Sequence, residues 1–190
     1  MTPSNTVSKH HTRLIVTRPA ATSGVKTHLS TFQTMMALIL EAKSTLLLSS
    51  FALMASAEHI VASLATRSKE GVRITLCLDD GVRNVEHIRT LWPTEAPPPR
   101  LMVPDRSRWP AGSLHAKVLI ADGCRALVTS ANLTGWATDS NLEVGVLVDG
   151  AVSRELNDLF LELMRSKLLV EQPFQKAGTY RPRGRALGTS

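Results

Sequence analysis

The segment Leu114-HAKVLIADGCRALVTSANL-Thr134 contains two short apolar runs with polar residues at their ends. Asp122-Gly123, which lies between the runs, is a strong signal for the tight turn of a β-hairpin. The segment therefore predicts two strands joined through residues 122–124. Polar residues placed so regularly have two explanations, an ordinary decorated hairpin or an active site.

The polar residues of this hairpin are expected to form a cluster. Side chains two residues apart in a strand point to the same side, so His115 and Lys117 present an imidazole and an ammonium group together. The returning strand brings Thr129, Ser130 and Asn132 near the same end of the sheet. A possible nucleophile or acid–base group then lies beside a cation and several hydrogen-bond donors. This combination suits an anionic substrate whose charge grows in the transition state, as in phosphoryl transfer.

Alternating strands and helices are predicted around the hairpin. Strands at 44–51 and 72–78 enclose a helix at 57–70, for which Ser56 is a candidate N-cap and Gly71 a candidate stop. This order is the βαβ pattern of a parallel or mixed sheet covered by helices, and it predicts an α/β fold. The remaining predicted elements are helices at 31–43, 82–91 and 151–169 and strands at 13–17, 100–103 and 141–148.

Composition indicates one ordinary globular domain. The chain has 190 residues, of which 43% are hydrophobic and 20% charged, so it is long enough for a substantial core. The polar first residues lack the apolar region of a secretory signal, and no apolar run approaches the length of a membrane span. Cys77 lies in a predicted strand and Cys124 beside a predicted turn, so we expect two unpaired thiols in a reducing compartment. These features favour a cytoplasmic protein without a membrane partner.

The net charge of +6 is concentrated at the two ends of the chain. Residues 1–40 and 172–190 contain eight basic residues and no acidic ones, whereas the region between them has 14 basic and 16 acidic residues. We expect a basic N-terminal arm with a short strand at 1–29, a central domain at 30–171 and a basic C-terminal tail at 172–190. Such arms suit contact with a phosphate backbone, and they equally suit solvated tails that only improve solubility.

The spacing His-x-Lys-x4-Asp, followed by Ser-x-Asn, resembles the HKD motif of the phospholipase D superfamily. Here the motif consists of His115, Lys117, Asp122, Ser130 and Asn132. The order of helices and strands upstream also resembles that of the superfamily, so the resemblance covers most of Met35–Val148. It implies a phospholipase D-like fold, in which a mixed β-sheet is flanked by helices on both faces.

The resemblance implies a role for each residue of the motif. His115 would attack phosphorus and form a phosphohistidine, which divides the displacement into two steps. Lys117 and Asn132 would hold the non-bridging phosphate oxygens, with Ser130 assisting. No cofactor and no metal ion would be needed, and the sequence has no tight His/Cys/Asp cluster of the kind that binds metals.

Three further residues belong to this comparison. Asn141-Leu-Glu143 resembles an Asn-x-Glu element of the superfamily's nucleases, and Glu143 would hydrogen-bond His115 and fix its tautomer. Asp122 would be mainly structural and electrostatic around the site. Thr129 stands where the family usually has glycine, which implies a slightly different phosphate loop.

The single copy of the motif implies a second chain. The family mechanism uses one histidine as nucleophile and another as general acid, but the other histidines here lack a lysine two positions on. These are His10, His11, His28, His59 and His87. A symmetric homodimer, with two sites facing each other across the two-fold axis, would supply the missing histidine.

The segment 112–150, with Trp109-Pro110 before it, is also similar to the phospholipase-D-like component of bacterial DISARM anti-phage defence systems. This resemblance implies a role in bacterial defence among other defence-system subunits. The first hypothesis is therefore a homodimeric, metal-independent phosphodiesterase, an endonuclease acting on nucleic acid, with DNA favoured. The alternatives are a non-catalytic nucleic-acid-binding subunit of a defence complex and, less favoured, a phospholipid-hydrolysing enzyme.

Two groups of residues outside the motif are also candidates for function. Arg106, Arg108 and Trp109 lie in the predicted loop before His115, where they could grip a nucleic-acid backbone or stack on a base. Exposed arginines are equally common without such a role. Asp79 and Asp80 are adjacent at a strand end and would point in opposite directions, so we interpret them as loop and capping residues.

Overall fold

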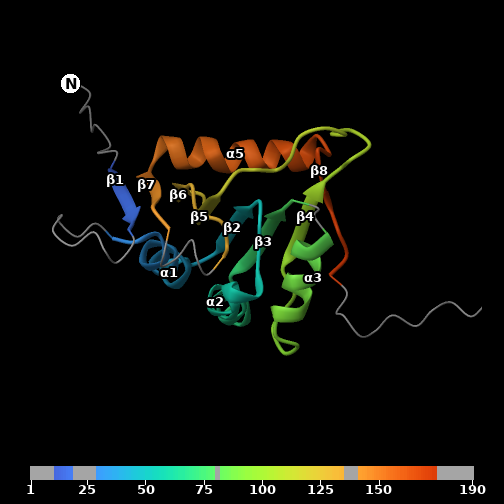
Figure 1. Cartoon of the computed structure of the whole chain (residues 1–190), viewed down its shortest axis with the longest axis horizontal. Helices are drawn as coiled ribbons and strands as arrows, with labels where there is room; N and C mark the ends of the chain where they lie inside the picture. Colours follow the sequence, from blue (N-terminus) through green and yellow to red (C-terminus); the bar gives the residue numbers. More distant parts are fainter. Residues whose placement is uncertain (1–10, 19–28, 80–81, 135–140, 175–190) are drawn as a thin grey trace, which may run out of the picture.

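An eight-stranded mixed β-sheet forms the centre of the molecule (Figure 1). The computed structural model describes residues 11–18, 29–79, 82–134 and 141–174. The strands lie side by side in the order β1-β7-β6-β5-β2-β3-β4-β8. Their bounds are β1 Thr12–Thr17, β2 Thr45–Ser50, β3 Arg73–Leu78, β4 Arg100–Pro104, β5 Val118–Ala121, β6 Arg125–Thr129, β7 Glu143–Asp149 and β8 Leu169–Glu171. The helices are α1 Thr31–Glu41, the 3-10 turn η1 Ala55–Ala57, α2 Glu58–Lys69, α3 Val82–Leu91 and α5 Ala151–Arg165.

Parallel and antiparallel pairing occupy different parts of the sheet. β2, β3 and β4 are parallel neighbours, as expected for strands connected by helices. The predicted hairpin is formed by β5 and β6, which pair antiparallel through a turn in which Asp122 and Gly123 both have positive φ. Antiparallel β1 and β8 close the two sides of the sheet.

Helices cover both faces of the sheet. α1, α2 and α3 lie on one face, and α5 crosses the other (Figure 1). Leu38, Ile60 and Ile88, one from each of the first three helices, belong to one buried cluster with the sheet residues that face them. Phe160 of α5 packs with Ile120 in a second cluster on the opposite face. Because both faces are buried, the central strands read as continuous apolar runs. The predicted mixed sheet with helices on both faces is confirmed.

The end of the last helix differs from the prediction of a helix over 151–169. α5 ends at Arg165, and Lys167 adopts a left-handed conformation with φ 58°. This residue turns the chain back, so that β8 pairs with β4 instead of extending the helix. The apolar run carried no signal for this change because the same residues can face a core from a helix or a strand.

The start of α2 also differs from the prediction. Ser56 was expected to cap the helix, but it lies within the 3-10 turn η1, and Ala57 occupies the N-cap position without a side-chain cap bond. The predicted stop is correct, since Gly71 follows the helix with φ 90°. In contrast, α1 begins with a capping box in which Ser30 and Gln33 bond each other's backbone.

Both cysteines are free, as predicted. Cys77 is fully buried in β3, and this burial raises the pKa of its thiol to about 12. Cys124 is exposed in the β5–β6 turn. The Cys77 thiol is therefore a packing group, since a thiol needs to lose its proton to react.

Strand direction brings several strand ends to a single edge of the sheet. The carboxyl ends of the parallel strands β2, β3 and β4 meet there, and the start of β5 joins them because Val118 pairs with Ser49 near the end of β2. The end of β6 and the start of β7 lie at the same edge, where Thr129 pairs with Gly145. We call this the carboxyl edge. Asp122 follows β5 and lies at the opposite edge.

Candidate active site

His115 and Lys117 meet at the carboxyl edge, immediately before β5. Lys117 Nζ lies 2.9 Å from His115 Nδ1 and 3.3 Å from His115 Nε2, and it donates to the His115 carbonyl oxygen at 2.8 Å. Residues 114–117 are not part of the strand, but the Lys117 carbonyl accepts from Thr129 N at 3.1 Å and so continues the contact between the two hairpin arms. The structure therefore brings the two side chains together, as their spacing predicts.

The two side chains differ in their contact with solvent. His115 is exposed, whereas Lys117 is only 8% exposed. Burial lowers the pKa of Lys117 because water no longer stabilises the ammonium group, and the negative charge of Glu143 opposes this effect. A poorly hydrated cation beside an exposed imidazole is well suited to hold an anionic group next to a nucleophile.

An aromatic ring supports this pair. The Phe51 ring lies 4.6 Å from the His115 ring, centroid to centroid, with a tilt of 47°. Lys117 Nζ lies 5.7 Å from the same ring centroid, within reach of a cation–π interaction. The backbone of this segment is fixed by Asn84, whose side chain donates to the Phe51 carbonyl at 2.8 Å and accepts from Leu53 N at 2.9 Å. Sequence reasoning missed Phe51.

The loop after β6 supplies the other polar groups. Thr129 Oγ1 accepts from Ala131 N at 3.2 Å and tightens the turn that carries Ser130. Ser130 Oγ donates to Glu143 and accepts from the Val144 backbone N–H. Asn132 Oδ1 accepts from Ala52 N at 3.2 Å, which ties the loop to the segment after β2.

Thr129 stands where the superfamily that the motif resembles usually has glycine, and the neighbouring strand accommodates its side chain. Its partner in β7 is Gly145, where an added Cβ would lie 2.6 Å from the Val128 carbonyl oxygen and 3.0 Å from the Thr129 Cβ. A side chain at position 145 would therefore force the two strands apart. Gly145 on β7 thus leaves the space that the Thr129 side chain occupies.

Glu143 lies at the start of β7 and is buried. Its carboxylate accepts from Ser130 Oγ and from Asn141 Nδ2. Within the described residues these are the hydrogen bonds of its side chain, so the expected bond from Glu143 to His115 is not formed. Instead, Lys117 contacts the His115 ring, and Glu143 acts on that lysine through its charge.

Comparison with known proteins assigns the chain to a family. Residues 35–164 match the family model described as "Cardiolipin synthase, PLD-like domain", which covers more than half of the chain. The chain is a member of the PLD-like domain family. A curated relative, the DISARM protein DrmC of Bacillus paralicheniformis, is 26% identical over 125 residues. The match covers 66% of this chain and 52% of the relative, so the chain spans about half the length of that protein.

Solved structures of PLD-family proteins share the fold. Nuc from Salmonella typhimurium, a phospholipase D family member, aligns with a TM-score of 0.62 at 17% identity over 86% of this chain and 99% of that chain. NucT from Helicobacter pylori aligns with a TM-score of 0.64 at 12% identity over 86% of this chain and 100% of that chain. At these identities the likeness establishes the PLD-like fold.

Asp122 lies outside this PLD-like site. It is at the far end of β5, five residues beyond Lys117, or about 16 Å along an extended chain. Its carboxylate accepts from the backbone N–H groups of Lys43, Ser44 and Thr45 and from Ser44 Oγ. Burial is the largest single effect and raises the pKa of Asp122, but the hydrogen bonds together outweigh it and lower the pKa to about 2. Its expected structural role agrees with these contacts, whereas its expected place beside the phosphate site does not.

The loop before His115 is held by contacts within the chain. The Arg106 guanidinium pairs with Asp79 and donates to the Gly112 carbonyl, while Arg108 donates to the Ser166 carbonyl at 2.5 Å. Trp109 packs against the cluster under α5. Contact of these three residues with nucleic acid stays a prediction. Asp80 lies outside the described residues, as does Trp136, which follows the Ser-Ala-Asn segment in the sequence and for which packing is the favoured role over lining a cleft.

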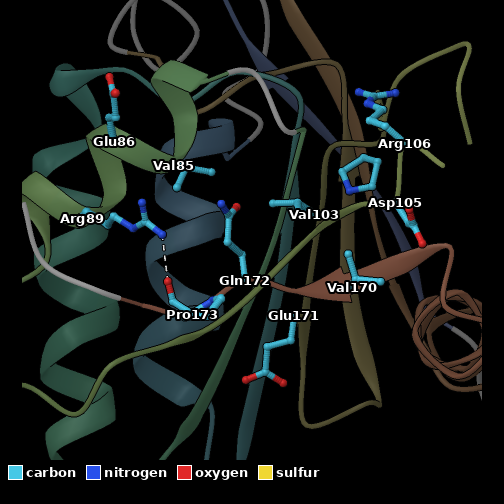
Figure 2. A pocket seen from close by; sticks show the side chains of 11 residues that line it. Val85, Glu86, Arg89, Val103, Asp105, Arg106, Val170, Glu171, Gln172 and Pro173 are labelled. Carbon is cyan, nitrogen blue, oxygen red and sulfur yellow. Dashed lines mark hydrogen bonds between the residues drawn. The ribbon is translucent and has the colours of Figure 1, made fainter. Parts of the chain in front are cut away.

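A cavity of about 570 Å³ lies behind the same loop, between α3 and β8. Figure 2 shows Val85 and Arg89 on one side of it and Val170 on the other, with Asp105 and Arg106 at its border. His115 and Lys117 are not among its lining residues. The cavity therefore borders the loop that precedes His115, through Asp105 and Arg106, and is separate from the His115–Lys117 pair.

The described part of the chain offers neither a metal-binding cluster nor a membrane-spanning helix. Those residues contain no group of three or more His, Cys, Asp or Glu side chains arranged to hold a metal ion. No helix in the same ranges is long and apolar enough to cross a membrane.

Proposed function

We propose that this PLD-like protein is a phosphodiesterase that cleaves nucleic acid through a phosphohistidine on His115. The observation that carries the proposal is the exposed His115 imidazole, held between buried Lys117 and Phe51 at the carboxyl edge. A phosphodiester entering there would take over the hydrogen bonds of the Lys117 ammonium, because its oxygens are stronger acceptors than a ring nitrogen. The ring nitrogens of His115 would then be free to attack.

The reaction consists of two displacements. In the first, a lone pair of a His115 ring nitrogen forms a bond to phosphorus, and the bond from phosphorus to the leaving oxygen breaks as that oxygen takes a proton from a general acid. In the second, water attacks phosphorus and gives a proton to the group that served as general acid, the phosphorus–nitrogen bond breaks with its electron pair returning to His115, and the phosphate monoester leaves. Lys117 and Ser130 would stabilise the charge that grows on the non-bridging oxygens.

The general acid would come from a second copy of the chain. The other five histidines of the sequence lack a lysine two positions on, so a second HKD motif would have to come from another chain. Exposed apolar side chains lie beside the site, Leu142 and Val144 on either side of Glu143 and Leu14 on neighbouring β1. Contiguous exposed apolar groups favour an interaction surface. A two-fold dimer that covers them would bring two His115 side chains to one cleft.

Nucleic acid is favoured over phospholipid as the substrate. The net charge of +6 and the basic ends of the sequence suit a polyanionic backbone. Similarity to the DISARM protein DrmC supports a role in anti-phage defence. In that role DNA would be the substrate, and other defence subunits would be the partners. The basic arms at 1–29 and 172–190 would extend the backbone contact beyond the cleft.

A second function is favoured by one observation. Lys117 contacts both ring nitrogens of His115, and Glu143 is bonded elsewhere, so this form of the site is arranged for holding rather than for attack. The protein would then bind nucleic acid as a non-catalytic subunit of a defence complex.

The test is cleavage of labelled single- and double-stranded DNA by the full-length protein in EDTA, beside His115→Ala. Cleavage that requires His115 supports the nuclease, whereas binding without cleavage supports the subunit. Vesicles of phosphatidylcholine form a third arm of the experiment. Choline release that requires His115 would identify phospholipid, rather than nucleic acid, as the substrate. Light scattering of the active sample tests the dimer, which an active monomer would contradict.

A further inference from the structure

Asp79 connects the end of β3 to the loop that delivers His115. Its carboxylate accepts from Leu114 N at 2.8 Å, one residue before the histidine. The same carboxylate lies 3.3 and 3.4 Å from Arg106 Nη2, near the start of that loop. Asp79 therefore holds both ends of the loop 105–114 with one side chain.

Arg106 extends this connection into the loop. Its Nη1 donates to the Gly112 carbonyl at 2.8 Å, across a turn in which Gly112 has φ 85°. It also lies 3.5 Å from the Trp109 carbonyl, while the Trp109 ring packs under α5. The Arg106 guanidinium therefore joins the two sides of the loop and is itself paired with Asp79.

Asp79 is well anchored for such a role. The residue is only 8% exposed. Its carbonyl accepts from Asn84 Nδ2 at 3.1 Å, and its N–H approaches the Ser50 carbonyl at 3.5 Å. Asn84 also fixes Phe51, which packs on the His115 ring. The residues that follow β2 and β3 therefore hold both the backbone before His115, through Asp79, and the His115 ring, through Phe51.

We propose that Asp79 is a positioning residue for His115, with Arg106 as its partner, and that this pair sets the direction from which the imidazole meets phosphorus. The proposal rests on the proposed function and adds residues outside the motif to it. A buried carboxylate near a phosphate site repels the substrate unless its charge is compensated. Arg106 provides that compensation through its ion pair with Asp79.

The experiment compares Asp79→Ala and Asp79→Asn with Asp122→Ala in the full chain. Asp122 is a matched control because it also holds backbone N–H groups at a strand end, but outside the site. Per folded molecule, we expect Asp79→Ala to lower kcat by about 10- to 100-fold with KM changed less than about twofold, since misplacing a nucleophile slows the chemical step. Asp79→Asn should recover part of the loss because its amide oxygen still accepts from Leu114 N. Equal losses in Asp79→Ala and Asp122→Ala, or a change in KM alone, would overturn the proposal.

A second measurement needs no catalysis. The Cε1–Hε1 NMR signal of His115, assigned by its absence in His115→Ala, should shift or broaden in Asp79→Ala and stay unchanged in Asp122→Ala. An unchanged His115 signal in Asp79→Ala overturns the positioning role. If the wild type cleaves nothing and the signal still responds to Asp79→Ala, the proposed function fails while the positioning role stands.

Discussion

The two ends of β5 belong to one sequence motif and differ in almost every physical respect. At the far end, the Asp122 carboxylate is saturated by backbone and hydroxyl donors that join the hairpin turn to the α1–β2 connection. At the carboxyl edge, the exposed His115 ring has Lys117 as the polar partner of its nitrogens among the described residues. One end is complete within the chain, and the other retains groups that a ligand can still engage.

This difference teaches how the motif divides its tasks. Polar groups whose hydrogen bonds are all made within the chain stabilise the fold. A site instead keeps polar groups with unused hydrogen-bonding capacity for its ligand, and the rest of the fold has to hold those groups in place. Substitutions at the far end should therefore change stability, and substitutions at the carboxyl edge should change activity.

The largest expected effect is that of His115→Ala. Removal of a nucleophile costs about 10⁴-fold or more in kcat, while the exposed ring contributes little to stability, so the melting temperature should change by less than about 2 °C. Cleavage assays and thermal unfolding measure the two quantities. His59→Ala is the control, because His59 is an exposed histidine on α2. Comparable activity of the two variants would end the proposed role of His115.

Lys117→Met should follow, with a loss of about 10²- to 10³-fold in the cleavage rate from the missing charge stabilisation. Because burial lowers the pKa of Lys117, the rate should also decline at high pH earlier than an exposed lysine would allow. Rate against pH in the wild type checks this. A rate that stays constant through the alkaline range would show that the ammonium charge is not used.

Phe51→Ala should have a smaller effect on activity, about tenfold in kcat, because it frees the His115 ring without removing a reacting group. Phe51→Tyr, which keeps the ring, should recover most of the rate. Single-turnover kinetics separate this effect from product release. If Phe51→Tyr lost as much of kcat as Phe51→Ala, contact with the His115 ring would not explain the effect, and packing of the core would be the role of Phe51 instead.

Asp122→Ala should change activity least, by less than about twofold per folded molecule, while lowering the free energy of unfolding by about 2 kcal/mol. The wild-type carboxylate has a pKa of about 2 in the folded protein, against about 3.9 in an unfolded chain. Its stabilising effect is therefore complete above about pH 4 and disappears as the pH falls towards 2. Urea unfolding of the wild type and the variant at pH 2 to 6 measures the free energy of unfolding of each. A difference between the two that does not change with pH would contradict the proposed contribution of the Asp122 carboxylate.

Much of the fold could be predicted because it depends on local signals. The Asp-Gly turn predicts the β5–β6 hairpin, and the strand–helix–strand order predicts parallel β2 and β3. The spacing of His115 and Lys117 also predicts their contact, although both precede the strand. Asp122 was placed too near the site because the motif was treated as one cluster, whereas a four-residue strand separates its ends.

The rest depends on contacts between distant segments. Phe51 and Asp79 directly follow the parallel strands β2 and β3. Their contacts with His115 and Leu114 follow from the pairing of β2 with β5 and β3 rather than from any local pattern. The bond from Leu114 N to Asp79 joins residues 35 positions apart, so the neighbouring sequence carries no signal for it. The hydrogen bonds of Glu143 likewise depend on where the loop after β6 places Ser130.

The most direct test of the central claim is to trap the covalent intermediate. The wild-type protein is mixed with a DNA substrate in EDTA, quenched under denaturing alkaline conditions that preserve phosphohistidine, digested, and mapped by mass spectrometry. The account predicts a nucleotide or phosphoryl adduct on the peptide that carries His115, absent from His115→Ala. Cleavage that proceeds in His115→Ala, or an adduct on another residue, would contradict it.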